Sequence, residues 1–116
     1  MKTILAENVL INGNWEKDQV LTIKEGVITH IEALPDSKKQ REEIPERVSN
    51  RLIPGYIDTQ VNGGGGVMFN HAPTFKSIEI MAKAHRKFGT TTLFPTLITD
   101  DITTIESAAN AVSEAI

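Results

Sequence analysis

The sequence contains no cysteine, so neither a disulfide framework nor a thiolate metal site can form within it. It has no apolar run approaching the roughly 20 residues that a membrane-spanning helix needs. Glu7 and Asn8 come too early in the chain for a secretory signal peptide. No charge of one sign dominates, because 12 basic and 15 acidic residues give a net charge of −3, which argues against nucleic acid as a partner. These absences predict a cytoplasmic protein with no membrane and no nucleic-acid partner.

The first part of the chain has the pattern of a small antiparallel sheet. Residues 20–23 and 27–31 are runs rich in β-branched residues, and Gly26 between them can take the positive φ of a tight turn. So small a sheet buries too little apolar surface to be stable alone, and we expect it to pack on another part of the protein. Residues 35–51 are dense in mixed charge and predict a solvated connector that could hold a helical turn. The first domain is thus predicted at residues 1–51.

From residue 52 onward the pattern alternates between strands and helices. Residues 52–62 predict a buried strand, and residues 90–98 predict a second one. Apolar residues at helical spacing lie between them, with Thr74 as the expected N-cap and Gly89 as the expected C-terminal glycine. A second helix is expected after the capping residues 99–101.

The fold class predicted by this order is α/β, with residues 52–116 forming the first two βα units of a (β/α)₈ barrel. Strand–helix alternation gives parallel strands with right-handed crossovers, and such strands need neighbours on both sides. A complete barrel takes about 250 residues, so this stretch would supply only a quarter of one. The chain also stops at Ile116 within an apolar helical stripe, which predicts a fragment or a domain that was cut.

Candidate functional residues stand at the end of the first predicted barrel strand, because working residues of barrels lie at the carboxyl ends of strands. Strand alternation predicts that Gln60 and Asn62 point to one side, with Asp58 below them. Polar side chains there need partners, or each costs about 1–3 kcal/mol. They could serve a ligand site, or they could merely form hydrogen bonds around the barrel mouth.

A family resemblance bears on this choice. Residues 54–62, Pro-Gly-Tyr-Ile-Asp-Thr-Gln-Val-Asn, resemble the opening strand of the amidohydrolase superfamily, Pro-Gly-x-Ile-Asp-x-His-x-His. Gln60 and Asn62 occupy the positions of the two metal-binding histidines, and their neutral amide oxygens are weaker ligands for zinc-like metals. N-acetylglucosamine-6-phosphate deacetylases of the enterobacterial type carry the same Gln-x-Asn, followed by a glycine-rich loop like residues 63–70. Residues 93–99 are similar to that family's second strand, and the resemblance covers essentially the whole chain.

The resemblance implies that the full-length enzyme hydrolyses the acetamide of N-acetylglucosamine 6-phosphate to glucosamine 6-phosphate and acetate. One divalent metal, usually zinc, would polarise the carbonyl and activate a water, and an aspartate would act as general base and then acid. Because the family takes these groups from later strands, no catalytic residue and no metal ligand is expected within this chain. Gln60, Asn62, Gly63 and Gly64 would line the active site, with Gln60 and Asn62 at the vacated metal position.

The same resemblance implies a homodimer or homotetramer, and it implies that the N-terminal strands form part of a small β-sandwich domain completed by the C-terminal end of the full-length chain. Two other functions stay open. One is another amidohydrolase, such as a dihydroorotase-like cyclic amide hydrolase, against which Gln60 and Asn62 argue. The other is a non-catalytic amidohydrolase-like module. We predict that the isolated 116 residues bind no stoichiometric zinc and show no turnover.

The remaining polar features give weaker signals. The glycine run 63–66 lacks a Walker lysine, so it is interpreted as a wall of the pocket rather than a phosphate cradle. Met68 and Phe69 are expected to be apolar plugs beneath it. His71 is a loop histidine whose role the sequence leaves open, and His85 is expected to pack along its helix. These two and His30 share no metal-ligand spacing.

Overall fold

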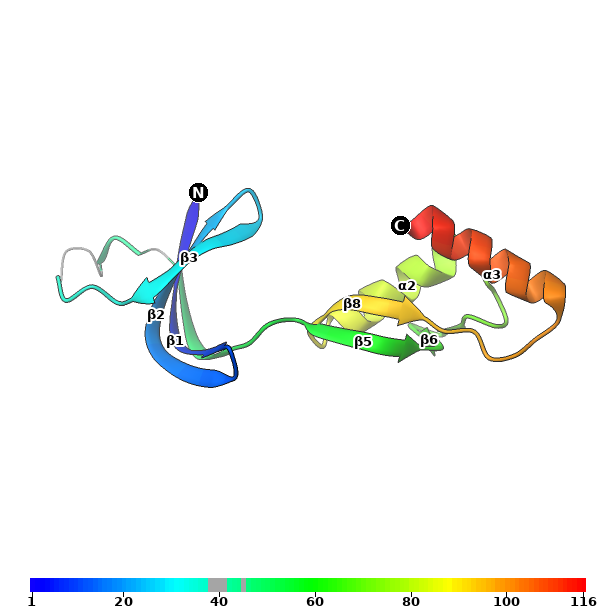
Figure 1. Cartoon of the computed structure of the whole chain (residues 1–116), viewed down its shortest axis with the longest axis horizontal. Coiled ribbons are helices and arrows are strands. Elements are labelled where there is room, and N and C mark those ends of the chain that lie inside the picture. Colours follow the sequence, from blue (N-terminus) through cyan, green and yellow to red (C-terminus); the bar gives the residue numbers. More distant parts are fainter. Residues whose placement is uncertain (38–41, 45) are drawn as a thin grey trace. The chain divides into compact units, whose positions relative to one another are not determined.

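Residues 1–37, 42–44 and 46–116 are described by a computed structural model, which divides the chain into two units, Met1–Pro54 and Gly55–Ile116 (Figure 1). The division falls three residues beyond the boundary predicted at Arg51. The reason is that Leu52 still pairs with Val9 in the sheet of the first unit.

The first unit is a four-stranded sheet in the order β3-β2-β1-β4. Its strands are β1 (Lys2–Ile11), β2 (Asn14–Lys24), β3 (Val27–Ala33) and β4 (Glu46–Leu52). Two tight turns join the antiparallel strands, and both central residues of each turn have positive φ, as a type I′ hairpin requires. Asn12 and Gly13 form the first turn, and Glu25 and Gly26 form the second.

Strand β4 corrects the prediction of a solvated connector over residues 35–51. It runs parallel to β1 at the edge of the sheet, and only Val48 and Leu52 in it are even partly buried. A charged edge strand has little of the apolar alternation by which strands are recognised, and charge at an edge also discourages pairing with other chains. Residues 38–41 and 45 of the predicted connector, on which part of the possible helical turn falls, lie outside the described residues.

The core of the first unit is small. Ala6, Val9 and Leu21 form its buried cluster, with Ile11 and Leu52 packed against them. Beside it lies an apolar groove of about 310 Å³, whose lining includes Ile28 and Ile31, which are 53% and 39% exposed. This exposed apolar surface agrees with the expectation that the sheet packs on another part of the protein. The β-sandwich itself stays a prediction.

The second unit has the predicted order of strand, helix, strand and helix. Its two longer strands, β5 (Tyr56–Val61) and β8 (Thr90–Pro95), are parallel, and helix α2 (Phe75–Arg86) connects them. A short hairpin of β6 (Gly63–Gly64) and β7 (Val67–Met68) precedes α2, and α3 (Ile102–Ala115) follows β8. The helices pack over one face of the strands, around a core that consists of Val61, Phe69, Ile78, Met81, Ala108 and Ala111. None of the helices in the described part of the chain is long and apolar enough to cross a membrane.

The helix ends follow their local signals. The hydroxyl of Thr74 accepts a hydrogen bond from the Ser77 N–H, which confirms the predicted N-cap. Among the expected capping residues 99–101, Asp101 is the N-cap, and its carboxylate accepts a hydrogen bond from the Thr104 N–H. The pKa of Asp101 is lowered, chiefly by a hydrogen bond from the Thr103 hydroxyl and then by the one from the Thr104 N–H. Gly89 has a φ of +98° and lies two positions past the C-cap residue Lys87, where the chain turns into β8.

Candidate functional site

The pairing of β5 with β8 is irregular at the end where the candidate residues lie. Asp58 pairs with Leu93 and Val61 pairs with Pro95, so three steps along β5 match two along β8. This extra residue is the defining property of a β-bulge, a feature that redirects side chains and often lies near active sites. Because the backbone N–H of Gln60 lies inside the irregular stretch, its partner is a side chain: it donates to Asp58 Oδ1 at 3.2 Å.

The bulge overturns the predicted orientation of Asp58. Simple alternation placed it on the same side as Gln60 and Asn62. Its strand partner Leu93 instead packs against the core beneath the helices, and Asp58 Oδ2 lies 3.8 Å from Nδ1 of His85 on α2. Val61 also faces this core, so the extra residue changes the side on which each following residue points.

Gln60 and Asn62 lie at the carboxyl end of β5, where the sequence predicted them. Gln60 is exposed, whereas Asn62 is half-buried. Asn62 Nδ2 donates to the backbone carbonyl of Thr96 at 3.0 Å, and the backbone carbonyl of Asn62 accepts from the Phe69 N–H at 2.8 Å. Asn62 therefore joins the end of β5 both to the residue that follows β8 and to the residue that follows β7.

The glycine run forms this hairpin, and glycine is required because other groups lie very close. A Cβ on Gly63 would lie 2.5 Å from the Val67 carbonyl oxygen, and one on Gly64 would lie 2.8 Å from His85 Nε2. Gly65 and Gly66 make the turn with φ of +63° and +87°. The glycines thus allow a close approach of the loop to helix α2.

His85 does more than pack along its helix. Its Nε2 lies 3.0 Å from the Gly63 carbonyl oxygen, and since a carbonyl only accepts, Nε2 must carry a proton. The helical stripe in the sequence indicated a packing position for His85, but no local signal points to a partner 22 residues earlier in the chain.

Asn70 is a second residue that the sequence analysis missed. Its side-chain amide accepts from the Ile98 N–H at 2.9 Å, and it donates to the Ile98 carbonyl at 2.8 Å and to Asp100 Oδ2 at 2.9 Å. The hydrogen bonds of Asn70 connect the loop after β7 to the loop after β8. An asparagine in a loop favours a turn, but it does not indicate a contact 28 residues away.

The remaining residues that the sequence singled out are His71, Met68, Phe69 and His30. His71 is exposed, and its backbone N–H donates to the Met68 carbonyl at 3.1 Å. Phe69 is 1% exposed in the core, as expected of a plug, whereas Met68 is 42% exposed. His30 is exposed in the sheet of the first unit.

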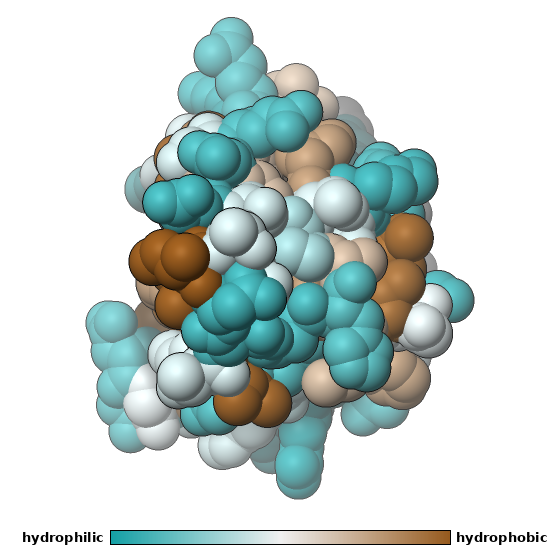
Figure 2. All heavy atoms as spheres, turned by 90° about the vertical axis from the view of Figure 1, so that its right-hand side faces the viewer, coloured by the Kyte–Doolittle hydropathy of each residue, from teal (hydrophilic) through white to brown (hydrophobic). Residues whose placement is uncertain are grey.

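This end of the second unit does not itself present a metal site. No cluster of three or more histidine, aspartate or glutamate side chains that could hold a metal ion occurs among the residues that the structure describes. Gln60 and Asn62 supply only neutral amides, and the Asn62 nitrogen is engaged with Thr96. Figure 2 views the end toward which β5 and β8 point, and hydrophilic residues cover most of its centre, with separate hydrophobic residues around them. The surface is suited to hydrogen bonding with a polar ligand.

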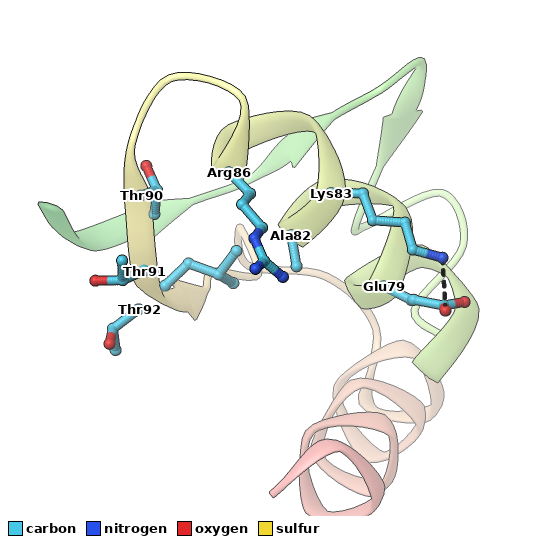
Figure 3. Close-up of a pocket in the computed structure, with 8 residues that line it drawn as sticks. Glu79, Ala82, Lys83, Arg86, Thr90, Thr91 and Thr92 are labelled. Carbon is cyan, nitrogen blue, oxygen red and sulfur yellow. Dashed lines mark hydrogen bonds and ion pairs between the residues drawn. The ribbon is translucent and has the colours of Figure 1, made fainter. Parts of the chain in front are cut away.

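A hollow in the second unit lies away from this end. It has a volume of about 450 Å³ and lies between α2 and the amino-terminal part of β8, with Arg86 pointing into it (Figure 3). The Glu79 carboxylate on its rim accepts hydrogen bonds from Lys76 and Lys83 at 2.7 and 2.8 Å, and these lysines lower its pKa to about 2. An acid already paired with two lysines, at the wrong end of the strands, does not indicate catalysis.

No family model matches the chain. It is 44% identical over 109 residues to an N-acetylgalactosamine-6-phosphate deacetylase of Shewanella sp. (strain ANA-3), covering 93% of this chain and 28% of that protein. It is 34% identical over 110 residues to an N-acetylgalactosamine-6-phosphate deacetylase of Escherichia coli O157:H7, covering 94% and 27%. It is 43% identical over 65 residues to an N-acetylglucosamine-6-phosphate deacetylase of Haemophilus influenzae, covering 56% and 17%.

Solved structures give the same picture. The chain superposes on an N-acetylglucosamine-6-phosphate deacetylase from Pasteurella multocida with a TM-score of 0.78 and 28% identity, covering 98% of this chain and 30% of that one. The enzyme of the same name from Mycobacterium smegmatis matches with a TM-score of 0.84 at 22% identity, covering 98% and 31%, which shows a shared fold. These likenesses confirm a fold of mixed sheets and helices. The chain spans about 28% of the length of the first curated relative.

Proposed function

We propose, because this chain is homologous to amino-sugar 6-phosphate deacetylases, that the full-length protein hydrolyses the acetamide of an N-acetylhexosamine 6-phosphate. Water would add to the amide carbonyl, the C–N bond would break, and acetate and the free amino-sugar phosphate would be released. The observation that carries the proposal is the 44% identity to such an enzyme over 93% of the chain. It is supported by Gln60 and Asn62, which lie at the carboxyl end of a strand, where active sites of βα barrels lie.

We further propose that β5, α2, β8 and α3 are the first two βα units of a (β/α)₈ barrel. The face of β5 and β8 opposite the helices carries exposed apolar side chains, among them Ile57 at 65% and Phe94 at 53%. A parallel sheet with apolar residues on both faces needs cover on both, which a closed barrel would supply. By the same homology we propose that the first unit is part of a β-sandwich, and that the protein is a cytoplasmic homodimer or homotetramer.

In this proposal the present chain contributes the wall of the active site. Gln60, Asn62, Gly63 and Gly64 line it, whereas the catalytic acid/base and the ligands of a divalent metal, which we propose to be zinc, lie outside these residues. The metal would act as a Lewis acid on the amide carbonyl. Asn62 donates through Nδ2 to Thr96, so its Oδ1 is the atom that can accept a hydrogen bond from water or substrate.

A second candidate differs in the sugar. The two relatives with 44% and 34% identity that align with 93% and 94% of the chain are both named for N-acetylgalactosamine 6-phosphate. A Vibrio furnissii relative named for N-acetylglucosamine 6-phosphate is 31% identical over 110 residues. The galacto epimer is therefore a specific alternative to the gluco substrate that the sequence resemblance implied.

One assay separates these candidates. The purified full-length protein is incubated with each of the two sugar phosphates and with dihydroorotate as a cyclic amide, and acetate or ring opening is measured. We expect acetate from at least one sugar phosphate, and the ratio of kcat/KM values identifies the preferred epimer. Ring opening without acetate release would favour the cyclic amide hydrolase, and no turnover at all would favour the non-catalytic module.

A further inference from the structure

The segment from Asp58 to Gly63 carries Gln60 and Asn62, but regular strand pairing does not fix its shape. The β-bulge interrupts the β5–β8 ladder within it. The Gln60 N–H donates to the side chain of Asp58. The Asn62 side chain is held by its hydrogen bond to the Thr96 carbonyl, but the bulge bends the backbone on which both amide side chains stand, and a contact with α2 would fix that backbone.

His85 makes a hydrogen bond at one end of the segment and faces the other end. Its Nε2 donates to the carbonyl of Gly63 at 3.0 Å, and its Nδ1 lies 3.8 Å from Oδ2 of Asp58. The second distance is too long for a hydrogen bond but allows an ionic attraction when the imidazole is protonated. The two atoms of His85 thus face the residue that begins the bulge and the residue that follows Asn62.

The support behind His85 is rigid. It lies in the last turn of α2, and the same helix places Ile78 and Met81 in the core at 7% and 0% exposure. The loop also fits closely against the imidazole, because a Cβ on Gly64 would lie 2.8 Å from Nε2. A residue that only filled space on the helix would need neither a donor at this atom nor a glycine opposite it.

We propose that His85 is a positioning residue, which holds the segment 58–63 against α2 and so fixes Gln60 and Asn62 in the active site. This inference rests on the proposed function, in which those two side chains line the site. His85 acts through them and does not touch the substrate. Displacing a positioned group by about 1 Å can cost a hundredfold in rate, so a loosened segment has a measurable effect.

The test compares three variants in the full-length protein. His85→Ala removes the hydrogen bond to Gly63 and the imidazole that faces Asp58. His85→Gln keeps a donor that can reach the Gly63 carbonyl, and His30→Ala is the matched histidine control in the other unit. We expect His85→Ala to lower kcat by about 10- to 100-fold with KM changed less than about threefold. His85→Gln should recover most of the lost kcat, and His30→Ala should equal wild type. Wild-type kcat in His85→Ala, or folded His85→Gln no better than His85→Ala, would overturn the proposal.

A second measurement does not depend on turnover. The Phe69 N–H donates to the backbone carbonyl of Asn62 at 2.8 Å, so the hydrogen exchange of this N–H reports how well the segment is held. In His85→Ala we expect exchange at this amide to become at least about tenfold faster, and in His85→Gln to return toward the wild-type rate. If wild type releases no acetate from either sugar phosphate, the proposed function fails while this measurement still decides the role of His85. Unchanged exchange in His85→Ala would refute it.

Discussion

Asn70 and Ile98 are joined by two hydrogen bonds: Ile98 N–H donates to Asn70 Oδ1 at 2.9 Å, and Asn70 Nδ2 donates to the Ile98 carbonyl at 2.8 Å. Asn62 makes a related contact with the Thr96 carbonyl at 3.0 Å. Both contacts connect a side chain that follows β5 to backbone that follows β8. Side chains thus hold together the end of the second unit where the candidate site lies, beyond the last backbone pair of the two strands.

The first prediction concerns Asn70→Asp. An aspartate keeps the acceptor for Ile98 N–H but loses the donor, and it brings a second carboxylate next to Asp100. We expect a loss of about 1–2 kcal/mol in the free energy of unfolding, from urea titration of the full-length protein. Asn110→Asp, an exposed position on α3, makes the same change of charge and should have little effect. Equal stability of the two variants would show that the Asn70 contacts contribute nothing.

The second prediction tests the contact between Gly64 and His85. Gly64→Ala adds a Cβ 2.8 Å from His85 Nε2, and we expect it to lower the free energy of unfolding by about 1–3 kcal/mol. The φ of Gly64 is not positive, so the cost reports the steric contact rather than backbone strain. In a His85→Ala background the same substitution should cost at least about 1 kcal/mol less, whereas in a His30→Ala background its cost should be unchanged. If Gly64→Ala costs the same in the His85→Ala background as in wild type, the proposed contact between Gly64 and His85 is wrong.

Features that depend on neighbouring residues were predictable from the sequence, whereas features that depend on distant residues were not. The cap at Thr74, the capping segment 99–101 and the strand–helix order were predicted because each depends on residues within a few positions of one another. The bulge between Asp58 and Val61 could not be predicted, since it depends on the register with β8, more than 30 residues later. The partners of His85 and Asn70 were missed for the same reason.

The prediction of a solvated connector where strand β4 lies was wrong for a different reason. Its residues Glu46–Leu52 carry four charged or amide side chains, so the composition indicates a solvated segment. What makes it a strand is its parallel pairing with β1, for example Leu5 with Arg47 and Val9 with Leu52. Backbone pairing at a sheet edge places few demands on side chains, and the sequence therefore gives little sign of it.

The third prediction concerns acid stability. Glu79 has a pKa lowered from 4.5 to about 2 by hydrogen bonds from Lys76 and Lys83. A pKa lowered in the folded state contributes stability above the unfolded value, and this contribution is lost as the pH falls from about 4.5 toward 2. Glu79→Gln should therefore lose stability at neutral pH and show a shallower decline between these pH values. Because both lysines are exposed and Glu79 is only half-buried, salt should reduce the difference, and Glu106→Gln on α3 is the control. Parallel curves for wild type and Glu79→Gln would exclude the effect.

The fourth prediction tests Gln60 and Asn62 directly in the full-length protein. Replacing both with alanine removes the proposed wall of the active site and the bond from Asn62 to Thr96, and we expect kcat/KM to fall by at least about tenfold. Gln60→Ala alone should leave the melting temperature nearly unchanged, since Gln60 is exposed, whereas Asn62→Ala should lower it by a few degrees.

Replacing both residues with histidine instead restores the His-x-His pattern, and imidazoles bind zinc more strongly than amides do. If the two residues occupy a vacated metal position, the double-histidine protein should hold more metal per chain than wild type, as measured by atomic absorption after dialysis. A double-histidine protein with the metal content of wild type would place these side chains away from any metal position. If the double-alanine protein also kept full activity, Gln60 and Asn62 would be bystanders, and the hydrogen bond to Thr96 would be a structural contact alone.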